Sequence, residues 1–147
     1  MDAPVLIIWN EKYVVGNETL DEHHQRMLNI INDLYSRLQI GISSSELSQI
    51  LQDLIENAEI HFRAEEAVMQ ECGYPDLSEQ ENAHQRYIIE LRRLIIGINE
   101  DWSDSTNDLF VFLKGWWQGH IVKMDKKYSP FLGKLKDQDK IHSGDNG

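Results

Sequence analysis

Histidine, glutamate and aspartate side chains of the kind that bind metals occur at positions of this sequence where a helical pattern calls for apolar residues. Apolar residues recur every three or four positions, which is the spacing of one buried helical face. The pattern predicts amphipathic helices over residues 20–39, 45–71, 78–99 and 107–135. Six positions where leucine or isoleucine would complete the rows are His24, His61, Glu65, His84, His120 and Asp125. Because burying such groups without partners costs several kcal/mol, we expect them to converge on a positive centre, most simply a metal.

The links between the predicted helices are short, which makes successive helices antiparallel neighbours. We therefore predict an all-α fold, an up-down-up-down antiparallel four-helix bundle that forms one domain over residues 1–136. Thr19 is the predicted N-cap of the first helix, and Gly73 and Pro75 end the second. Polar residues 101–106 are predicted to link the last two helices.

The two ends of the sequence lack a helical period. Residues 1–19 carry apolar and aromatic side chains, so we predict an extended N-terminal arm packed across the bundle. A short edge strand at residues 5–9 is the alternative. Residues 137–147 are polar and rich in glycine, which predicts a disordered tail.

Composition excludes several classes of partner. The net charge of −11 disfavours nucleic acids and anionic membrane surfaces, since both attract positive charge. No apolar run approaches the roughly 20 residues of a membrane span, and the first residues lack the pattern of a secretory signal. The single cysteine, Cys72, excludes an internal disulfide and suits a reducing compartment. These features predict a cytoplasmic protein that binds neither nucleic acid nor membrane.

The six metal-type residues are too many for one tetrahedral ion. His61 and Glu65 lie one turn apart on one helical face, so both can reach the same centre. Imidazole and carboxylate together suit iron, zinc, manganese or copper. Glu65 and Asp125 could each bridge two metals through their two oxygens, which leaves four histidines as terminal ligands. The set is more natural for two metals than for one zinc ion.

The spacing from His120 to Asp125 does not fit an ideal α-helix. Five residues rotate by about 140°, so both side chains cannot face inward on regular geometry. A π-bulge would realign them, and such bulges are frequent at functional sites. We therefore predict a π-bulge between these two residues.

Several segments together resemble bacterial hemerythrin over about residues 5–135. They are Leu20-Asp21-Glu22-His23-His24, His61-Phe62-Arg63-Ala64-Glu65-Glu66 with Met69, Gly73-Tyr74-Pro75, Trp116-Trp117-Gln118-Gly119-His120-Ile121 with Asp125, and an arm with Trp9, Tyr13 and Gly16. The resemblance implies a four-helix bundle with a non-heme diiron centre that binds dioxygen reversibly, for delivery, storage or sensing.

The resemblance also implies a division of ligands between two iron ions (Fe2+/Fe3+). His24 and His61 would serve the iron with the open position, and His84 and His120 the other iron. Carboxylates, here Glu65 and Asp125, and an oxo or hydroxo group would bridge the pair. Dioxygen, or another small diatomic or anionic ligand, is the implied partner, and protein partners stay unknown.

The sequence departs from the family pattern at two positions. Gln80 stands where the family has a histidine, four residues before His84. Its amide oxygen is a weaker iron ligand than imidazole, and the alternative is a surface residue without a role. Trp117 stands where the family usually has leucine, and it either narrows or fills the dioxygen pocket or packs outward against the arm or another helix. Phe62 and Ile121 are, with Trp117, the candidate walls of that pocket.

The sequence favours a binding protein over an enzyme, because no general acid or nucleophile is evident beyond the metal ligands. A redox enzyme acting on dioxygen, peroxide or nitric oxide is the alternative, since Gln80 would leave a second open position. An interaction module with a decayed metal site is a third class.

Overall fold

The fold is all-helical in the part of the chain that the computed structural model describes, residues 5–100 and 102–132. The elements are η1 (Glu11–Tyr13), α1 (Glu18–Ile40), α2 (Ser44–Glu71), α3 (Leu77–Glu100), α4 (Trp102–Trp116) and the π-helix η2 (Trp117–Met124). An α-helix continues from η2 to residue 132. The ends predicted for the last helix at 135, for the domain at 136 and for the tail at 137–147 lie outside the described residues. None of the described helices is long and apolar enough to cross a membrane.

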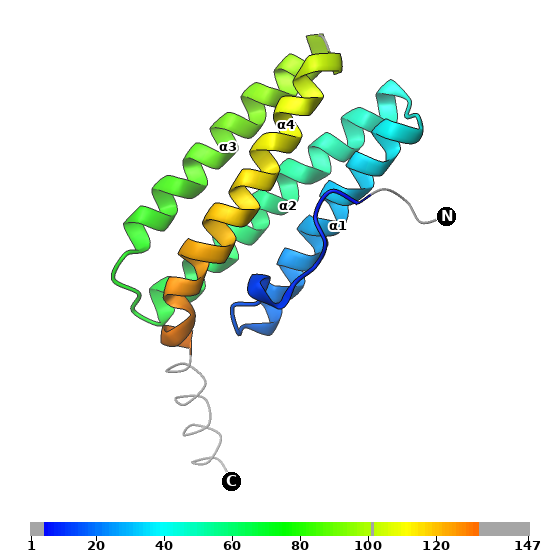
Figure 1. The fold of residues 1–147 in the computed structure, drawn as a ribbon. Coiled ribbons are helices and arrows are strands. Elements are labelled where there is room, and N and C mark those ends of the chain that lie inside the picture. Colours follow the sequence, from blue (N-terminus) through cyan, green and yellow to red (C-terminus); the bar gives the residue numbers. More distant parts are fainter. Residues whose placement is uncertain (1–4, 101, 133–147) are drawn as a thin grey trace.

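The four helices form the predicted up-down-up-down bundle (Figure 1). α1 packs against α2, α2 against α3, and α3 against α4. Polar side chains cap the starts of the first two helices: the side chain of Asn17 accepts a hydrogen bond from Leu20 N, and that of Ser43 accepts one from Glu46 N. α1 ends at Gly41, whose φ of 132° suits glycine. The predicted cap at Thr19 was therefore wrong by two positions.

The predicted link at residues 101–106 was also wrong, because α4 begins at Trp102. Only residue 101, which lies outside the described residues, separates α3 from α4. The polar composition of this segment was read as a loop. Serine, aspartate and threonine are equally suited to the first turn of a helix, where free backbone N–H groups need acceptors.

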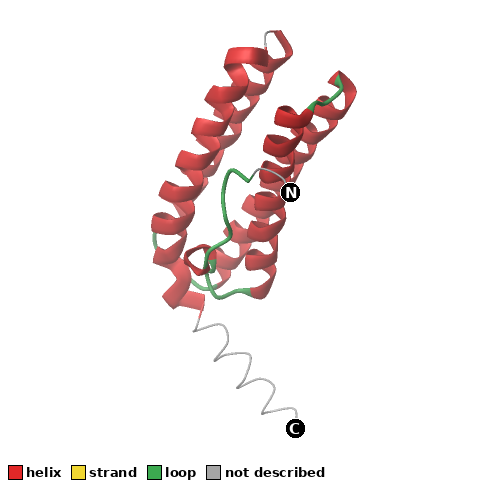
Figure 2. Ribbon diagram, turned by 45° about the vertical axis from the view of Figure 1, so that its right-hand side comes forward, coloured by secondary structure: helices red, strands yellow, loops and turns green. Residues whose placement is uncertain are grey.

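The N-terminal arm covers the seam between α1 and the helix formed by α4 and η2 (Figure 2). On one side, Asn32 of α1 accepts hydrogen bonds from Leu6 N and Ile7 N, both at 3.0 Å, and donates to Ile7 O at 2.8 Å. On the other side, Lys126 donates to Val14 O and Ser129 to Val15 O. The packed arm is as predicted, and its described residues form no edge strand.

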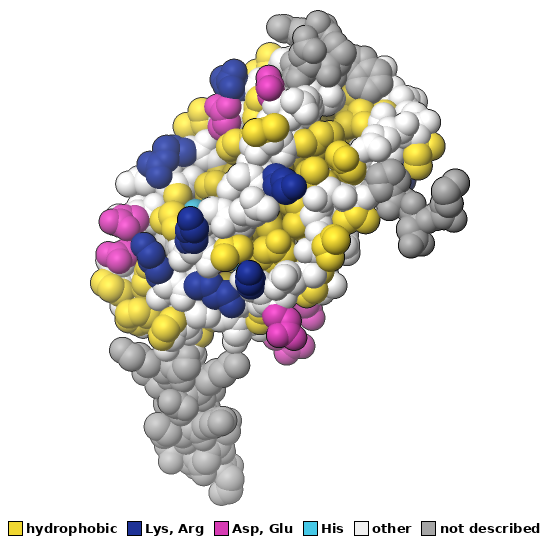
Figure 3. Space-filling view, in the orientation of Figure 1, with side chains coloured by type: hydrophobic (Ala, Val, Ile, Leu, Met, Phe, Trp, Pro, Cys, Tyr) yellow, Lys and Arg dark blue, Asp and Glu magenta, His cyan; other side chains and the backbone are white. Residues whose placement is uncertain are grey.

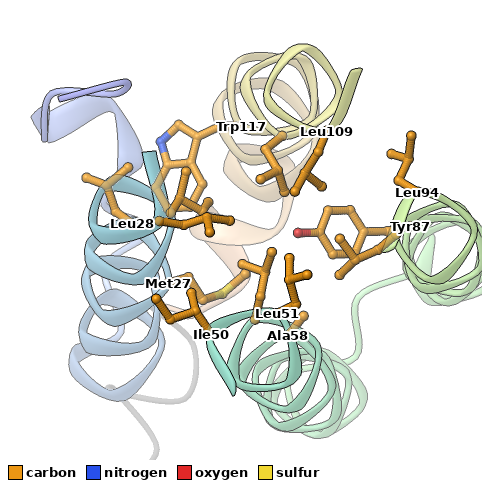
Figure 4. Close-up of a cluster of buried hydrophobic side chains, with 14 of the residues drawn as sticks. Met27, Leu28, Ile50, Leu51, Ala58, Tyr87, Leu94, Leu109 and Trp117 are labelled. Atoms are coloured by element: carbon orange, nitrogen blue, oxygen red, sulfur yellow. The ribbon is translucent and has the colours of Figure 1, made fainter. Parts of the chain in front are cut away.

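The core consists of two apolar clusters with a polar layer between them. The larger cluster gathers side chains from the arm and all four helices (Figure 4), and the smaller one contains Val15, Leu20, Met69, Tyr74, Tyr128 and Leu132. On each helix a metal-type residue falls between the two: His24, for example, stands between Leu20 of the smaller cluster and Met27 of the larger. The bundle thus shields the polar layer from solvent at both ends.

Candidate metal centre

The structure brings the six predicted metal-type residues together in the bundle interior. His84 and His120 are 3% and 6% exposed, and the other four at most 1%. They form two groups, each with ligand atoms within 4.8 Å of one another, and Glu65 belongs to both. The first group is His24, His61, Glu65 and Asp125, and the second is Glu65, His84 and His120.

Each carboxylate places one oxygen at each pair of histidines. Glu65 Oε2 lies 3.2 Å from His61 Nε2, and its Oε1 lies 2.8 Å from His84 Nε2. Asp125 Oδ2 lies 3.5 Å from His24 Nε2, and its Oδ1 lies 3.1 Å from His120 Nε2. This is the arrangement that two bridging carboxylates need.

Despite these short distances, many of the facing atoms lack hydrogen bonds. Those buried without such a partner include His24 Nε2, Glu65 Oε1, His84 Nε2, His120 Nε2 and Asp125 Oδ1. Their lone pairs therefore face a shared space and not one another. A buried polar atom without a partner costs about 1–3 kcal/mol, so the layer is unfavourable unless something fills that space. Imidazole nitrogens and carboxylate oxygens fit first-row metal ions, so the donor set fits a metal centre.

Contacts behind the histidines orient their rings. His24 Nδ1 lies 2.8 Å from Tyr13 O of the arm, and since the carbonyl only accepts, Nδ1 carries the proton and Nε2 the lone pair. His84 Nδ1 lies 3.6 Å from Glu66 Oε2, and His61 Nδ1 lies 3.4 Å from a nitrogen of His23. His120 has no such contact behind its Nδ1, but it too turns its Nε2 to a carboxylate, as the other three histidines do.

The turn between His120 and Asp125 is π-helical, as predicted. Asp125 N donates to His120 O, the i→i+5 hydrogen bond of a π-helix, at the end of η2. The wider turn brings both side chains to one face and allows the 3.1 Å contact between them. The irregularity is therefore what places the second carboxylate in the layer.

The charges in the layer favour cations. Burial would raise the pKa of Glu65, but His61 and His84 outweigh it and hold that pKa well below its usual range. Burial would lower the pKa of His24, but Asp125 and Glu65 raise it above its ordinary value. Burial would also lower the pKa of His84, but the hydrogen bond and charge of Glu65 raise it above its ordinary value. An ionised carboxylate attracts positive charge here, whether a proton or a metal ion carries it.

Aromatic rings wall the layer. Phe62 stacks on His84 with ring centroids 4.0 Å apart, and Trp116 stacks on His120 at 3.9 Å. Trp117 is 1% exposed, with its indole edge-on to His24 at 5.9 Å and to Tyr13 of the arm at 5.2 Å. Trp117 thus lies against the arm and the first group together. Ile121 is buried in the larger apolar cluster, and Trp116 is a further wall of the layer.

Gln80 is buried beside the second group, which rules out the surface reading. It is 1% exposed, and its Nε2 donates to Met124 O at 3.2 Å. Because that carbonyl accepts, the amide must present its nitrogen there. Its Oε1 is buried without a hydrogen bond. The amide is thus anchored to the last residue of η2, next to Asp125.

Tyr128 is a further residue of the layer, outside the set of metal-type residues that the sequence predicted. Its hydroxyl donates to Glu65 Oε2 at 2.8 Å. Burial and the charge of Glu65 raise the pKa of Tyr128, so it stays a neutral donor. Its position three residues after Asp125, on the same inward row, was the available signal.

Tyr128→Phe should weaken metal binding by about 10- to 100-fold, because partners that orient a ligand are typically worth that much in affinity. The change removes the hydroxyl that holds Glu65 and preserves the ring. Competition with a chelator of known affinity measures the effect. Tyr74→Phe, the same change at a neighbouring ring of the smaller cluster, is the control and should leave metal affinity unaltered. Equal affinities in both variants would show that Tyr128 does not orient Glu65.

Comparison with known proteins agrees with this site. The sequence profile of the Hemerythrin HHE cation binding domain matches residues 15–132. The bacteriohemerythrin of Stenotrophomonas maltophilia (strain R551-3) is 27% identical over 139 residues, which cover 93% of this chain and 84% of that protein. The bacteriohemerythrin of Campylobacter jejuni subsp. jejuni serotype O:23/36 (strain 81-176) is 29% identical over 120 residues, 81% of this chain and 90% of that protein.

Solved structures give the same result. A crystal structure of wild-type hemerythrin superposes with a TM-score of 0.76 at 26% identity, covering 87% of this chain and 98% of that one. A point mutant of hemerythrin gives a TM-score of 0.77 at 25% identity, over 88% of this chain and 98% of the other. The profile spans the arm's end, the four helices and all six metal-type residues. The chain therefore belongs to the hemerythrin family.

Proposed function

We propose that this protein binds dioxygen reversibly at a centre of two non-heme iron ions. Membership of the hemerythrin family and the shared fold support metal and oxygen binding. One observation carries the finer proposal: Glu65 and Asp125 each turn one oxygen toward His24 or His61 and the other toward His84 or His120. A single ion would leave half of these oxygens unused.

In this proposal His24 and His61 would hold the iron that binds dioxygen, and His84 and His120 would hold the other. Glu65 and Asp125 would supply a carboxylate oxygen to each iron. When bound, iron supplies the electrons and the open coordination position that dioxygen needs. The protein's residues do the rest: Tyr13 fixes the orientation of the His24 ring, Tyr128 holds Glu65, and Trp117 with the arm excludes water from the His24 side.

We propose binding and not catalysis because the proton donor at the layer is fully engaged. Tyr128 donates to Glu65, and its raised pKa keeps the proton on its oxygen. A redox enzyme acting on dioxygen, peroxide or nitric oxide is the second candidate. Gln80 favours it, because an amide anchored to Met124 in place of an imidazole leaves the His84/His120 iron one strong ligand short. We propose a cytoplasmic location, since Cys72 as the single cysteine suits a reducing compartment.

Anaerobic loading with ferrous iron followed by cycles of oxygen addition and removal tests the function. Reversible binding predicts an absorption band that appears with oxygen and disappears on its removal, over repeated cycles. An oxygen-consuming oxidase would instead bleach or oxidise irreversibly in the first cycle. Protein that takes up no iron would support the third class, an interaction module.

A further inference from the structure

Two surface grooves flank α3, and each reaches one histidine of the second group. The α3–α4 groove has a volume of about 540 Å³. Its lining includes Ala83, Arg86, Glu90, Trp116, His120 and Met124. The α2–α3 groove has a volume of about 590 Å³, and its lining includes Glu59, Phe62, Arg63, Glu66, Glu81 and His84. The face of the molecule over α3 and α4 shows a small patch of histidine surface close to basic side chains (Figure 3).

The first group of histidines is closed by comparison. The arm and Trp117 cover His24, whose Nδ1 is engaged by Tyr13 O. His24 and His61 are 0% and 1% exposed, whereas His120 is 6% exposed at the floor of its groove. A molecule arriving from solvent therefore meets His120 before it meets the dioxygen side of the centre.

The two grooves differ in charge. In the α3–α4 groove, Glu90 is neutralised by Arg93, whose Nε donates to it at 3.0 Å, so Arg86 gives this groove a net positive charge. In the α2–α3 groove, Glu59 is neutralised by Arg92, which donates to it at 2.7 Å, and the other two glutamates, Glu66 and Glu81, face one arginine, Arg63. Anions are therefore attracted to the first groove and repelled from the second.

Gln80 leaves a position at the inner end of the α3–α4 groove. Its amide nitrogen is held by Met124 O, and Met124, Ala83 and His120 all line that groove. Gln80 stands one turn before His84, so an imidazole there would share its face. Because its amide nitrogen is held at Met124, Gln80 can offer the centre only its carbonyl oxygen, a weaker iron ligand than imidazole.

We propose that small inorganic anions enter the α3–α4 groove past Arg86 and bind at the His84/His120 end of the centre, at the position that Gln80 leaves. This inference rests on the proposed iron centre and adds a second ligand position to it, separate from the dioxygen position at His24 and His61. The aromatic stack of Trp116 on His120 leaves little of that ring exposed, which restricts the ligand to a few atoms.

Azide binding to the oxidised, iron-loaded protein tests the route, with absorption followed by stopped flow. Gly115 lines the α3–α4 groove, and a Cβ added there meets no atom within 4 Å, so Gly115→Phe narrows the groove without a clash at its base. Gly119→Phe is the matched control: a Cβ there also meets nothing, and Gly119 does not line this groove. We expect azide association to slow in Gly115→Phe and not in Gly119→Phe.

Two further variants keep the test decisive if the bulky changes disturb folding. Arg86→Gln should slow azide association by about two- to fivefold at low salt, an effect that disappears at high salt, while Arg63→Gln in the other groove should not. Gln80→His should lower azide affinity at least about tenfold, because imidazole takes the coordination position. A crystal structure with azide at the His84/His120 end would confirm the position directly.

Contrary results are equally clear. The proposed route would be overturned if azide bound at the His24/His61 end. It would also be overturned if neither Gly115→Phe nor Arg86→Gln changed the rate of azide association. Iron content measured on the same samples distinguishes this failure from failure of the iron centre: missing iron would refute the proposed function, and the anion position with it, whereas full iron with unaltered rates would refute the route alone.

Discussion

Glu65→Ala should abolish metal binding at both halves of the centre, a loss of more than about 100-fold in affinity for each ion. Glu65 is the residue shared by the two groups, with one oxygen near His61 and the other near His84. Removing a direct ligand should cost more than the 10- to 100-fold typical of residues that only orient one. Metal analysis after dialysis against a weak chelator measures the loss.

The control for this change is Glu56→Ala, an exposed glutamate on the same helix, which should retain all metal. Thermal unfolding of metal-free samples separates loss of affinity from loss of fold. A Glu65→Ala protein that kept one ion tightly would show that Glu65 serves a single metal, and the bridging assignment would then be wrong.

Trp117→Leu should destabilise the protein by about 1–4 kcal/mol, by analogy with large-to-small changes in other cores. The indole is fully enclosed between His24, the arm and the larger apolar cluster, so a smaller side chain leaves a void beside the first group. Oxygen should reach the His24/His61 iron faster through that void. Chemical denaturation measures the stability, and stopped-flow oxygen binding measures the rate.

Trp116→Leu is the matched control for the rate, because Trp116 stacks on His120 at the other half of the centre. It should leave oxygen association at the His24/His61 iron unaltered. Equal oxygen rates in the wild-type protein and Trp117→Leu would show that the indole is ordinary packing and does not control access.

The rows of apolar residues were sufficient to predict the helices and the convergence of six polar side chains. A helical period predicts which residues share one face of a helix. Because that face is buried, His24, His61 and His84 point into the bundle together with the apolar residues of their rows. The π-helix between His120 and Asp125 was predictable for a similar reason, since regular geometry could not turn both residues to one side.

What escaped the sequence depends on contacts between distant elements. Tyr128 was not among the predicted site residues, because its hydrogen bond to Glu65 joins two helices that lie far apart in the sequence. Gln80 donates to the backbone carbonyl of Met124, the last residue of the π-helix η2. No pattern in the sequence predicts that hydrogen bond. The start of α4 was missed because polar residues suit both a loop and a first helical turn.

The polar layer also explains why metal should stabilise this fold. Without a cation, several buried nitrogens and oxygens of the layer face a shared space without hydrogen bonds. A ligand that binds only the folded state adds RT ln(1 + [L]/Kd), which is about 2.7 kcal/mol at a concentration 100 times Kd. Ferrous iron should accordingly raise the unfolding midpoint of the wild-type protein, and it should not raise that of Glu65→Ala.

The central claim is that six side chains hold two metal ions with both carboxylates between them. Anaerobic loading with ferrous iron, followed by a crystal structure with anomalous scattering measured at the iron edge, tests it most directly. The claim predicts two iron peaks per chain, one between His24 and His61 and one between His84 and His120, with Glu65 and Asp125 touching both. A single fully occupied peak, with the His84/His120 place empty beside Gln80, would contradict it.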